Sequence, residues 1–474
     1  MNADQAASYN EVPYPSLPYK MCHPRPLGVL AAFAGLSPAL PQKCRLLEIG
    51  CAGGGNILPM AQVFPQSQFM GVDLGSRHIA DAQAMAKAAQ INNVELLCRD
   101  ICEFEPDGSF DYIIAHGLYS WVPEGVRNRL LQLIGQHLSP GGVAFVSHMV
   151  NPGAYVWQSL RHAMLLTTRD LPMEQKARAG RDTIAAITEI SPKLAPRWGP
   201  LLLRWAKELD NYSDANFLHD QLGEEYFPVY LTEMVDHAAR NSLRYLGDTT
   251  IERWPGKPEV KQRVEQAAAD PLTRLQLVDI ASFRMYRQSI FCRADAPVVA
   301  VDATKLIQSA FIASDKGLPP ALAVAGSPRP PQPAAQISSQ NPLTREVLKS
   351  LAGIWPRAAS FAQLASQIRQ AMATASPDAV ARCILELHES DQVELWLNEP
   401  THFGDALDPS KARVSPLARA QAAGGGVVVN LRHEAFTGDD ALARRIISQL
   451  DGSPPSEEAL PHLAVLARHS MLMT

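Results

Sequence analysis

Residues Leu46 to Asn56 read L-L-E-I-G-C-A-G-G-G-N, and this stretch decides the fold. Leu46–Ile49 has the apolar character of a buried strand, four of the next six residues are glycine, and an apolar helix is expected from Ile57. A strand, a glycine turn and a helix start form the nucleotide-binding corner of a doubly wound α/β domain. Glycines let the backbone approach a ligand closely, and the helix start offers free N–H groups. We therefore expect a cofactor site at this turn.

The glycine turn departs from the fingerprint of dinucleotide-binding folds at two positions. Ala52 stands at the second glycine position, and Glu48 lies two residues before Gly50. These departures weigh against an NAD(P)-dependent oxidoreductase, which stays open as an alternative. The acidic residue two places before the glycine resembles the first motif of the class I S-adenosylmethionine (SAM) methyltransferases. In that family the turn faces the methionine half of the cofactor, so the resemblance implies contacts from Glu48, Gly50, Cys51, Ala52, Gly53 and Asn56.

Acidic residues follow the next two expected strands. Asp73 lies 23 residues beyond Gly50, where doubly wound folds place a carboxylate that accepts two hydrogen bonds from ribose hydroxyls. Asp100 follows the strand 94–98, and the methyltransferase arrangement implies that it reads the adenine amino group. The alternative for either aspartate is a helix cap or a turn. Cofactor contacts are expected from Asp73, Leu74, Asp100 and Ile101.

The expected fourth strand, 110–115, runs into His116, Tyr119 and Trp121. Ligands of open α/β sheets bind at the carboxyl ends of the strands, so we expect these three side chains to line the reaction pocket. His116 is expected to contact the cofactor as well, and it is the candidate general base because the sequence offers no clearer one. The alternative for a single histidine at a strand end is a structural role.

Residues 8–26 are rich in tyrosine and proline and cannot form a regular helix. Tyr9, Tyr14 and Tyr19 recur at intervals of five residues. Two interpretations are open: a disordered leader, or a cap that lies over the cofactor site and lends aromatic rings to it.

Composition predicts a multidomain globular protein. A chain of 474 residues with 46% hydrophobic and 19% charged residues is expected to form two or three domains. The net charge of -5 gives no basic surplus for nucleic acid or anionic membranes. The N-terminus lacks a signal-peptide pattern and no apolar run is long enough for a membrane span, so we expect a cytoplasmic protein without membrane insertion. Seven scattered cysteines predict neither disulfides nor zinc, and a metal or redox role for Cys98 and Cys102 is the minor alternative.

The C-terminal third begins after a proline-rich stretch, 314–342, which is typical of a semi-rigid linker. Beyond it, three expected helices and a strand suggest a winged-helix-like module. From Asn341 to the end there are 12 Lys and Arg against 15 Asp and Glu, a net charge of 12 − 15 = −3. A DNA reader needs a basic face, so protein docking or formation of a homodimer is favoured over nucleic-acid binding.

Further motifs extend the resemblance. The order E-I-G-C-A-G-G-G, G-V-D, R-D-I, F-D-Y-I-I-A-H-G and L-S-P-G-G is that of class I methyltransferases. The runs S-Y-N-E-V-P-Y-P-S, H-G-L-Y-S-W-V-P, N-F-L-H-D-Q-L and D-I-A-S-F-R-M-Y-R-Q-S-I-F-C resemble bacterial methyltransferases with an appended methyltransferase regulatory domain. The best-known members are rickettsial protein-lysine methyltransferases.

The resemblance implies a fold class and a domain order. We expect an α/β, Rossmann-like methyltransferase domain with a mostly parallel seven-stranded sheet, an α+β regulatory domain and a mainly helical C-terminal domain. The expected segments are a cap (1–26), the SAM-binding domain (27–155), a helical insert with the regulatory domain (156–313), the linker (314–342) and the winged-helix-like domain (343–474).

The resemblance also implies SAM as cofactor and a methyl acceptor as partner. A protein lysine is the favoured acceptor, and it must react as the free amine because its ordinary pKa is about 10.4. Burial in an aromatic pocket lowers that pKa, and the rings suit a methylammonium product. The expected pocket residues are Tyr9, Tyr14, Tyr119 and Trp121. Open alternatives are a small-molecule O- or N-methyltransferase and a non-catalytic SAM-binding regulatory protein.

Overall fold

The computed structural model describes residues 11–197, 199–249, 258–316, 341–400, 403, 412–436 and 441–473. Tyr9 and most of the expected linker, 314–342, lie outside these residues.

A seven-stranded sheet forms the centre of the described chain, in the order β3-β2-β1-β4-β5-β7-β6. The strands are β1 (Arg45–Ile49), β2 (Gln68–Asp73), β3 (Val94–Cys98), β4 (Phe110–Ala115), β5 (Leu138–Met149), β6 (Leu243–Asp248) and β7 (Tyr286–Arg293). β1 to β5 pair in parallel, and β7 runs antiparallel to both of its neighbours, β5 and β6. The predicted mostly parallel seven-stranded sheet is thus confirmed.

Both faces of the sheet are covered, which explains the continuous apolar runs in its strands. Successive side chains point to opposite faces, so Leu46 and Tyr112 belong to one core whereas Leu47 and Ile113 belong to the other. The helices of the first half are α2 (Pro24–Phe33), α3 (Ile57–Val63), α4 (Ser76–Ala88) and α5 (Glu124–His137). The sheet that carries the glycine turn is therefore packed against an apolar core on each of its two faces.

The last two strands come from far along the chain. β6 and β7 both begin far beyond residue 155, the expected domain boundary. Nevertheless, β7 pairs with β5 from Ala144 to Met149. The expected division into a SAM-binding domain (27–155) and a separate regulatory domain (156–313) therefore cuts through one sheet. Buried strands need partners for their backbone groups on both sides, and β7 supplies them for β5. Helices α10 (Leu231–Arg240), α11 (Pro258–Ala267) and α12 (Pro271–Ser282) accompany these strands.

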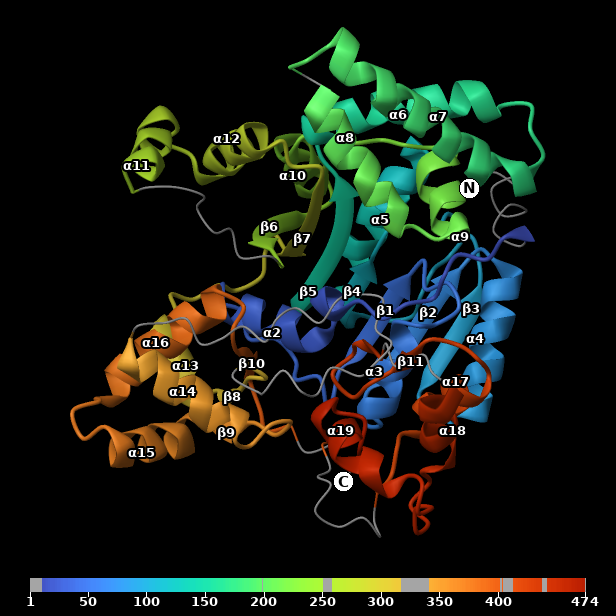
Figure 1. Cartoon of the computed structure of the whole chain (residues 1–474). Helices are drawn as coiled ribbons and strands as arrows, with labels where there is room; N and C mark the ends of the chain where they lie inside the picture. The colour runs from blue at the N-terminus through green and yellow to red at the C-terminus, as the bar shows by residue number, and fades with distance from the viewer. Residues whose placement is uncertain are drawn as a thin grey trace.

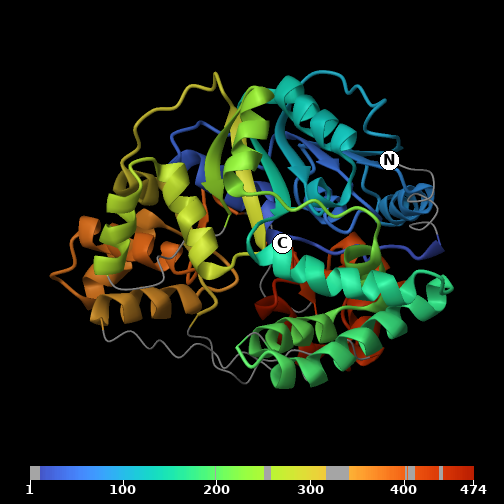
Figure 2. The ribbon, with the colours of Figure 1, turned by 90° about the horizontal axis from the view of Figure 1, so that it is seen from above.

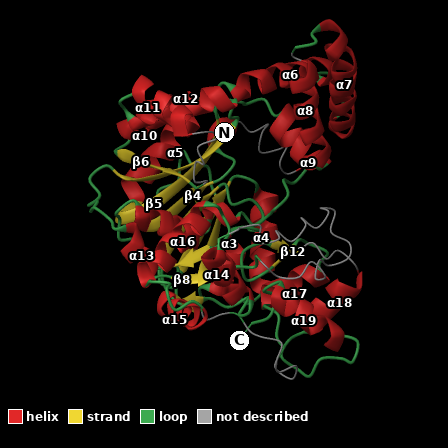
Figure 3. Cartoon of the chain, turned by 60° about the vertical axis from the view of Figure 1, so that its left-hand side comes forward, coloured by secondary structure: helices red, strands yellow, loops and turns green. Residues whose placement is uncertain are grey.

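Between β5 and β6 the chain forms a helical insert, residues 153–222. It comprises α6 (Gly153–Thr168), α7 (Met173–Leu194), α8 (Gly199–Glu208), α9 (Asp214–Asn216) and the π-helical turn η4 (Phe217–Gln221). The insert has its own apolar core, which includes Trp157, Ile184 and Phe217. Figures 1 and 3 show these helices gathered above the sheet, on the side opposite the C-terminal part of the chain.

The chain after residue 302 forms two bodies, which Figures 1 and 2 show in orange and red. The first, the winged-helix-like unit, contains α13 (Ala303–Ser309), β8 (Phe311–Ala313), α14 (Pro342–Ala352), β9 (Ala359–Ser360), α15 (Phe361–Ala371), α16 (Pro377–Glu389) and β10 (Glu394–Trp396). Its sheet has the order β10-β8-β9, so its central strand precedes the proline-rich stretch. The expected boundary at residue 343 therefore falls inside this unit.

The second body, the C-terminal unit, has a separate apolar core. It contains α17 (Pro416–Ala423), β11 (Val428–Val429), β12 (Ala435–Phe436), α18 (Ala441–Gln449) and α19 (Leu463–Arg468). α17 packs against α3 and α4, and the Leu417 N–H donates to Gln62 Oε1 at 3.0 Å. The C-terminal unit is thus attached to the helix that follows the glycine turn.

Candidate functional site

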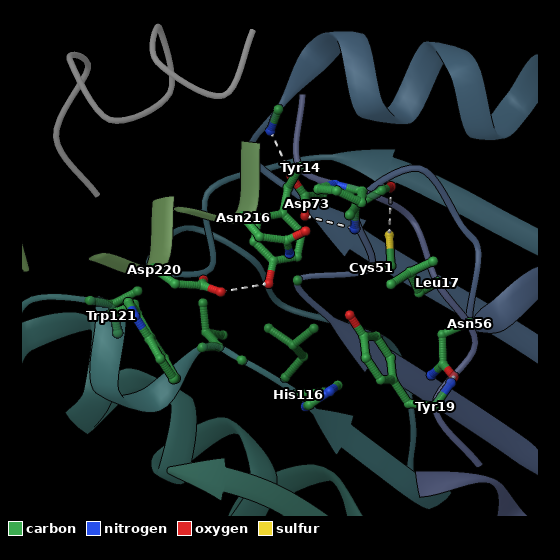
Figure 4. Close-up of a pocket in the computed structure, with 18 of the residues that line it drawn as sticks. Tyr14, Leu17, Tyr19, Cys51, Asn56, Asp73, His116, Trp121, Asn216 and Asp220 are labelled. Atoms are coloured by element: carbon green, nitrogen blue, oxygen red, sulfur yellow. Dashed lines mark hydrogen bonds between the residues drawn. The ribbon is translucent and has the colours of Figure 1, made fainter. Parts of the chain in front are cut away.

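A cavity of about 640 Å³ lies at the carboxyl edge of the sheet, between the glycine turn (residues 50–55), the N-terminal segment (residues 14–19) and the helical insert. Figure 4 shows side chains from all three parts directed into it. Its walls come from the strand ends of β1, β2 and β4, from the helical insert, and from Tyr226, Met285 and Tyr286 further along the chain. This is where open α/β folds bind their ligands.

The glycine turn is held in shape by Asp73. Gly50 has a φ of +77° and Ala52 a φ of +43°, so the chain enters the left-handed region twice within three residues. Asp73 Oδ2 accepts the Ala52 N–H at 2.9 Å, and Asp73 Oδ1 accepts the Gly75 N–H at 2.8 Å. Each carboxylate oxygen keeps a lone pair for a ligand, because a carboxylate accepts about four hydrogen bonds.

Glu48 is a buried carboxyl group on the cavity wall, only 3% exposed. Its Oε1 accepts a hydrogen bond from Asn56 Nδ2 at 2.7 Å, while Oε2 has no hydrogen-bond partner among the described residues. Burial raises the pKa of Glu48 from its ordinary 4.5 to about 8, and the Asn56 hydrogen bond offsets part of this rise. An unsatisfied buried oxygen is costly, so this position is complementary to a cationic donor from a ligand.

The N-terminal segment lies across the glycine turn. Ser16 Oγ accepts the Gly55 N–H at 2.5 Å, Tyr14 N donates to His78 Nε2 at 3.1 Å, and Tyr19 N donates to Asn56 Oδ1 at 2.9 Å. A Cβ at Gly55 would lie 2.4 Å from the Ser16 carbonyl carbon, so only glycine permits this approach. Of the two interpretations of this region, the structure shows the cap for residues 14–19.

On the insert side of the cavity lies Asp220, in η4. It accepts a hydrogen bond from the Tyr14 hydroxyl at 3.2 Å, and Figure 4 shows these two side chains directed toward each other. Burial raises the pKa of Asp220 from 3.8 to about 7, and the Tyr14 hydrogen bond lowers it. Burial also raises the pKa of Tyr14, which therefore stays protonated and acts as a donor. Asp220 is thus a carboxylate that exchanges a proton near neutral pH.

His116 lies at the end of β4, where the sequence predicts it, and it lines the cavity. Its Nδ1 is 3.0 Å from Ser147 Oγ and 3.3 Å from the Tyr286 hydroxyl, and its ring packs edge-on against Tyr19. Burial lowers the pKa of His116 to about 4. A histidine that is neutral and resists protonation at pH 7 is a weak base, so the prediction that His116 is the general base is not supported.

Comparison with known proteins agrees with this architecture. Residues 46–142 match the family described as "Methyltransferase domain", and residues 213–293 match the "Predicted methyltransferase regulatory domain". The uncharacterized protein RP028 of Rickettsia prowazekii is 30% identical over 241 residues, which cover 50% of this chain and 96% of that protein. The chain is a class I SAM-dependent methyltransferase with a methyltransferase regulatory domain.

Other similarities of this methyltransferase extend to most of the chain. The uncharacterized protein RP789 of R. prowazekii is 30% identical over 295 residues, which cover 61% of this chain and 53% of RP789. The structure of PKMT2 from Rickettsia typhi matches 97% of this chain and 100% of that chain, with a TM-score of 0.81 and 21% identity. PKMT2 in complex with AdoHcy gives a TM-score of 0.79 over 94% of this chain and 89% of that chain, with 24% identity. At these identities the structural similarity shows the fold. Within the described residues no helix has the length and apolar character to cross a membrane.

The structure brings most of the predicted site residues of this methyltransferase into one cavity. The predicted residues that line it are Tyr14, Glu48, Gly50, Cys51, Ala52, Asn56, Asp73, Leu74, Asp100, Ile101, His116 and Trp121. Gly53 is not among the lining residues and lies against Ser16 of the N-terminal segment. Asp100 also accepts the Cys102 N–H at 2.9 Å, so the turn role considered for it is present as well.

The prediction for Tyr119 is wrong. Tyr119 is 2% exposed, belongs to the apolar core beneath the sheet, and its hydroxyl lies 2.9 Å from His237 Nδ1. Tyr119 and Trp121 share one short helical turn, Tyr119–Trp121, on which residues two apart point in different directions. Trp121 therefore reaches the cavity and Tyr119 does not.

The regulatory-domain match contributes cavity residues that the sequence reasoning missed. They are Asn216, Asp220, Gln221, Tyr226 and Tyr286, joined by Trp157 and Tyr212 of the insert. The motif N-F-L-H-D-Q-L contains Asp220, and the single carboxylate in this motif was the available signal. Cys98 and Cys102 are exposed free thiols, and no group of His, Cys, Asp or Glu in the described part of the chain could hold a metal ion.

Proposed function

We propose that this methyltransferase transfers the methyl group of SAM to the amine of a protein lysine. The observation that carries the proposal is Asp220, a buried carboxylate that shares one cavity with the glycine turn and is surrounded by aromatic side chains. A carboxylate there attracts a cationic acceptor, whereas it repels an acceptor that is itself a carboxylate.

The residues around the glycine turn fit the cofactor. Glu48 has an unsatisfied oxygen for the ammonium group, Asp73 has free lone pairs for the ribose hydroxyls, and Asp100 lies where the adenine ring is expected. When bound, SAM supplies a methyl group made electrophilic by its sulfonium. The protein's own contribution is to align the acceptor with that methyl and to exclude water.

In this proposal Asp220 removes the proton from the lysine. A lysine ammonium among the rings of Tyr14, Trp121 and Tyr226 loses hydration, which lowers its pKa toward that of Asp220. The proton passes to Asp220, which leaves the amine with a lone pair. This lone pair would form the N–C bond with the methyl group of bound SAM, as the bond between that methyl and sulfur breaks and its electron pair stays on sulfur. Tyr14 keeps its own proton and holds the Asp220 carboxylate in place.

Two further observations bear on the acceptor. The resemblance to protein-lysine methyltransferases and the presence of three bodies beside the sheet support a protein acceptor. The negative net charge from Asn341 to the end argues for protein docking rather than nucleic acid, as the sequence predicts. A small amine is the second candidate, because the N-terminal segment and the insert enclose the site in a cavity rather than leaving a shallow groove.

The test is methyl transfer from labelled SAM to lysine-containing proteins and, separately, to small free amines. We expect incorporation into protein lysines, identified by mass spectrometry, and a loss of about 100-fold or more in kcat for Asp220→Asn. The dissociation constant for SAM should stay within about twofold of wild type in that variant. Labelling of small amines alone would favour the second candidate, and unchanged turnover in Asp220→Asn would contradict the proposed role of Asp220.

A further inference from the structure

A chain of buried polar contacts joins the C-terminal unit to the cofactor side of the cavity. His433 Nε2 lies 2.6 Å from Asn56 Oδ1, and Asn56 Nδ2 lies 2.7 Å from Glu48 Oε1. His433 and Asn56 are 4% and 3% exposed, so water does not compete for these contacts. Residues 377 positions apart in the sequence thus share a hydrogen bond directly behind Glu48.

The donor of each hydrogen bond in this series of contacts can be assigned, beginning with the Tyr19 backbone N–H. The Tyr19 backbone N–H, which can only donate, contacts Asn56 Oδ1 at 2.9 Å, so this atom is the amide oxygen. Its other contact, His433 Nε2, must then carry the proton. Burial lowers the pKa of His433 to about 3, so the ring is neutral and Nδ1 is unprotonated. Nδ1 has no hydrogen-bond partner in the described structure, so the Asn56 contact is the hydrogen bond that the ring makes.

The loop that presents His433 is built for this position. Asn430 Oδ1 accepts the backbone N–H groups of Arg432 and Glu434, both at 2.9 Å. His433 has a φ of +64°, in the left-handed region that few residues other than glycine adopt. Lys20, next to Tyr19, binds Glu434 at 2.6 Å. Strained backbone held by several hydrogen bonds is typical of residues that a site requires.

We infer that His433 is a positioning residue of the cofactor site. It fixes the Asn56 amide so that Nδ2 points at Glu48 Oε1, which leaves Glu48 Oε2 directed to the ammonium group of the cofactor. The C-terminal unit is therefore part of the SAM site, although none of its residues lines the cavity. The inference rests on the proposed placement of the cofactor's amino-acid end at Glu48.

Two substitutions at position 433 test the side-chain hydrogen bond separately from the backbone conformation. Gln carries a side-chain N–H that reaches about as far as histidine Nε2, but it is poorly suited to a positive φ. Asn accepts a positive φ readily, but its amide is too short to reach Asn56. If the hydrogen bond positions the site, His433→Gln keeps its affinity for SAM and His433→Asn loses affinity. If only the backbone matters, the order is reversed.

The experiment is calorimetric titration of the full-length protein and the two variants with SAM and with methylthioadenosine, which lacks the amino-acid end. We expect His433→Asn to weaken SAM binding about 10-fold and to leave methylthioadenosine binding within about twofold. His433→Gln should bind SAM within about threefold of wild type. Thermal unfolding of each variant confirms that it is folded.

Each contrary result has a distinct meaning. SAM affinity that is unchanged in His433→Asn, or reduced equally in both variants, would overturn the inference. Equal losses for SAM and methylthioadenosine would also overturn it, since they would indicate a general disturbance of the cavity. Glu48→Gln is the control for the underlying placement: if this variant binds SAM normally, the cofactor assignment fails rather than the role of His433 alone.

Discussion

Glu48 and Asp220 are buried carboxyl groups in one cavity, and burial raises the pKa of both. A carboxyl group with a raised folded-state pKa stabilises the protein below its unfolded pKa, and that stability is lost as the pH rises through the folded value. For Glu48 the loss extends from pH 4.5 to about 8, and for Asp220 from pH 3.8 to about 7. At neutral pH, Glu48 and Asp220 therefore lower the stability of the ligand-free protein. These are the two residues proposed to recognise the cofactor ammonium group and the acceptor lysine.

Replacing Glu48 with glutamine removes this cost. We expect ligand-free Glu48→Gln to be more stable than wild type by on the order of 2 kcal/mol at pH 8, with little difference at pH 4.5. Urea unfolding at the two pH values measures the effect. A stability difference that is the same at both pH values would show that Glu48 does not titrate as its burial requires.

The Tyr14 hydroxyl donates to Asp220 and so favours its ionised form. Asp220 acts as a base only when ionised, so activity should fall as the pH drops through about 7. We expect Tyr14→Phe to raise the pKa of Asp220 and to shift this acidic limb of the kcat profile upward by about half a pH unit or more. Tyr155→Phe, on an exposed face of α6, is the matched control. A limb that stays in place in Tyr14→Phe would contradict the role of this hydrogen bond.

The predicted residues that line the cavity are mostly those at or near the end of a strand. Glu48, Asp73 and His116 reach the cavity because parallel strands end at a common edge. The prediction for Tyr119 failed because the direction of its side chain depends on one short helical turn. Sequence spacing alone does not determine the geometry of that turn. Asp220 was not predicted because it enters the cavity from a helical segment that only long-range packing places there.

At the scale of elements, the N-terminal segment covers the glycine turn through a contact that requires glycine at position 55. We expect Gly55→Ala to displace the segment, to cost about 1–3 kcal/mol of stability and to weaken SAM binding. Gly125→Ala on α5 is the control, because a Cβ there meets nothing within 4 Å. Limited proteolysis near residues 11–19, with and without SAM, reports the displacement. Equal protection in Gly55→Ala and wild type would contradict it.

The strands β1 to β5 could be predicted because each carries a local pattern, an apolar run followed by a turn or an acidic residue. The segments that form β6 and β7 could be recognised only through the family resemblance. That these strands belong to the central sheet could not be predicted from the sequence. β7 pairs with β5 across more than a hundred residues, and no local pattern encodes such a pairing. For the same reason, the predicted boundary at residue 155 falls between strands of one sheet.

At the scale of the whole molecule, Glu394 of the winged-helix-like unit joins three parts of the chain. Lys20 Nζ lies 2.6 Å and Arg25 Nη2 3.8 Å from Glu394 Oε1, and Arg432 of the C-terminal unit pairs with the other oxygen. Although burial opposes ionisation, these three cations hold the pKa of Glu394 well below its ordinary value. The stability from this group is present at neutral pH and is lost as the pH falls through the folded pKa.

Loss of this carboxylate leaves three cations without their shared partner. We expect Glu394→Gln to destabilise the protein by about 3 kcal/mol at pH 7 and to weaken SAM binding through the Lys20 and His433 contacts. Glu458→Gln, which removes an exposed partner of Arg445, should cost less than about 0.5 kcal/mol. Urea unfolding at pH 7 measures both. Equal effects of the two substitutions would contradict the joining role of Glu394.

The central claim, that an acceptor amine meets Asp220 beside SAM, has a direct test that does not require the natural acceptor. A SAM analogue that carries a primary amine on a short alkyl arm, in place of the transferred methyl group, is compared with an analogue whose arm ends in a methyl group. We predict that wild type binds the amine analogue about 10-fold more tightly and that Asp220→Asn abolishes the difference. Equal affinities in wild type, or an advantage that persists in Asp220→Asn, would contradict the claim.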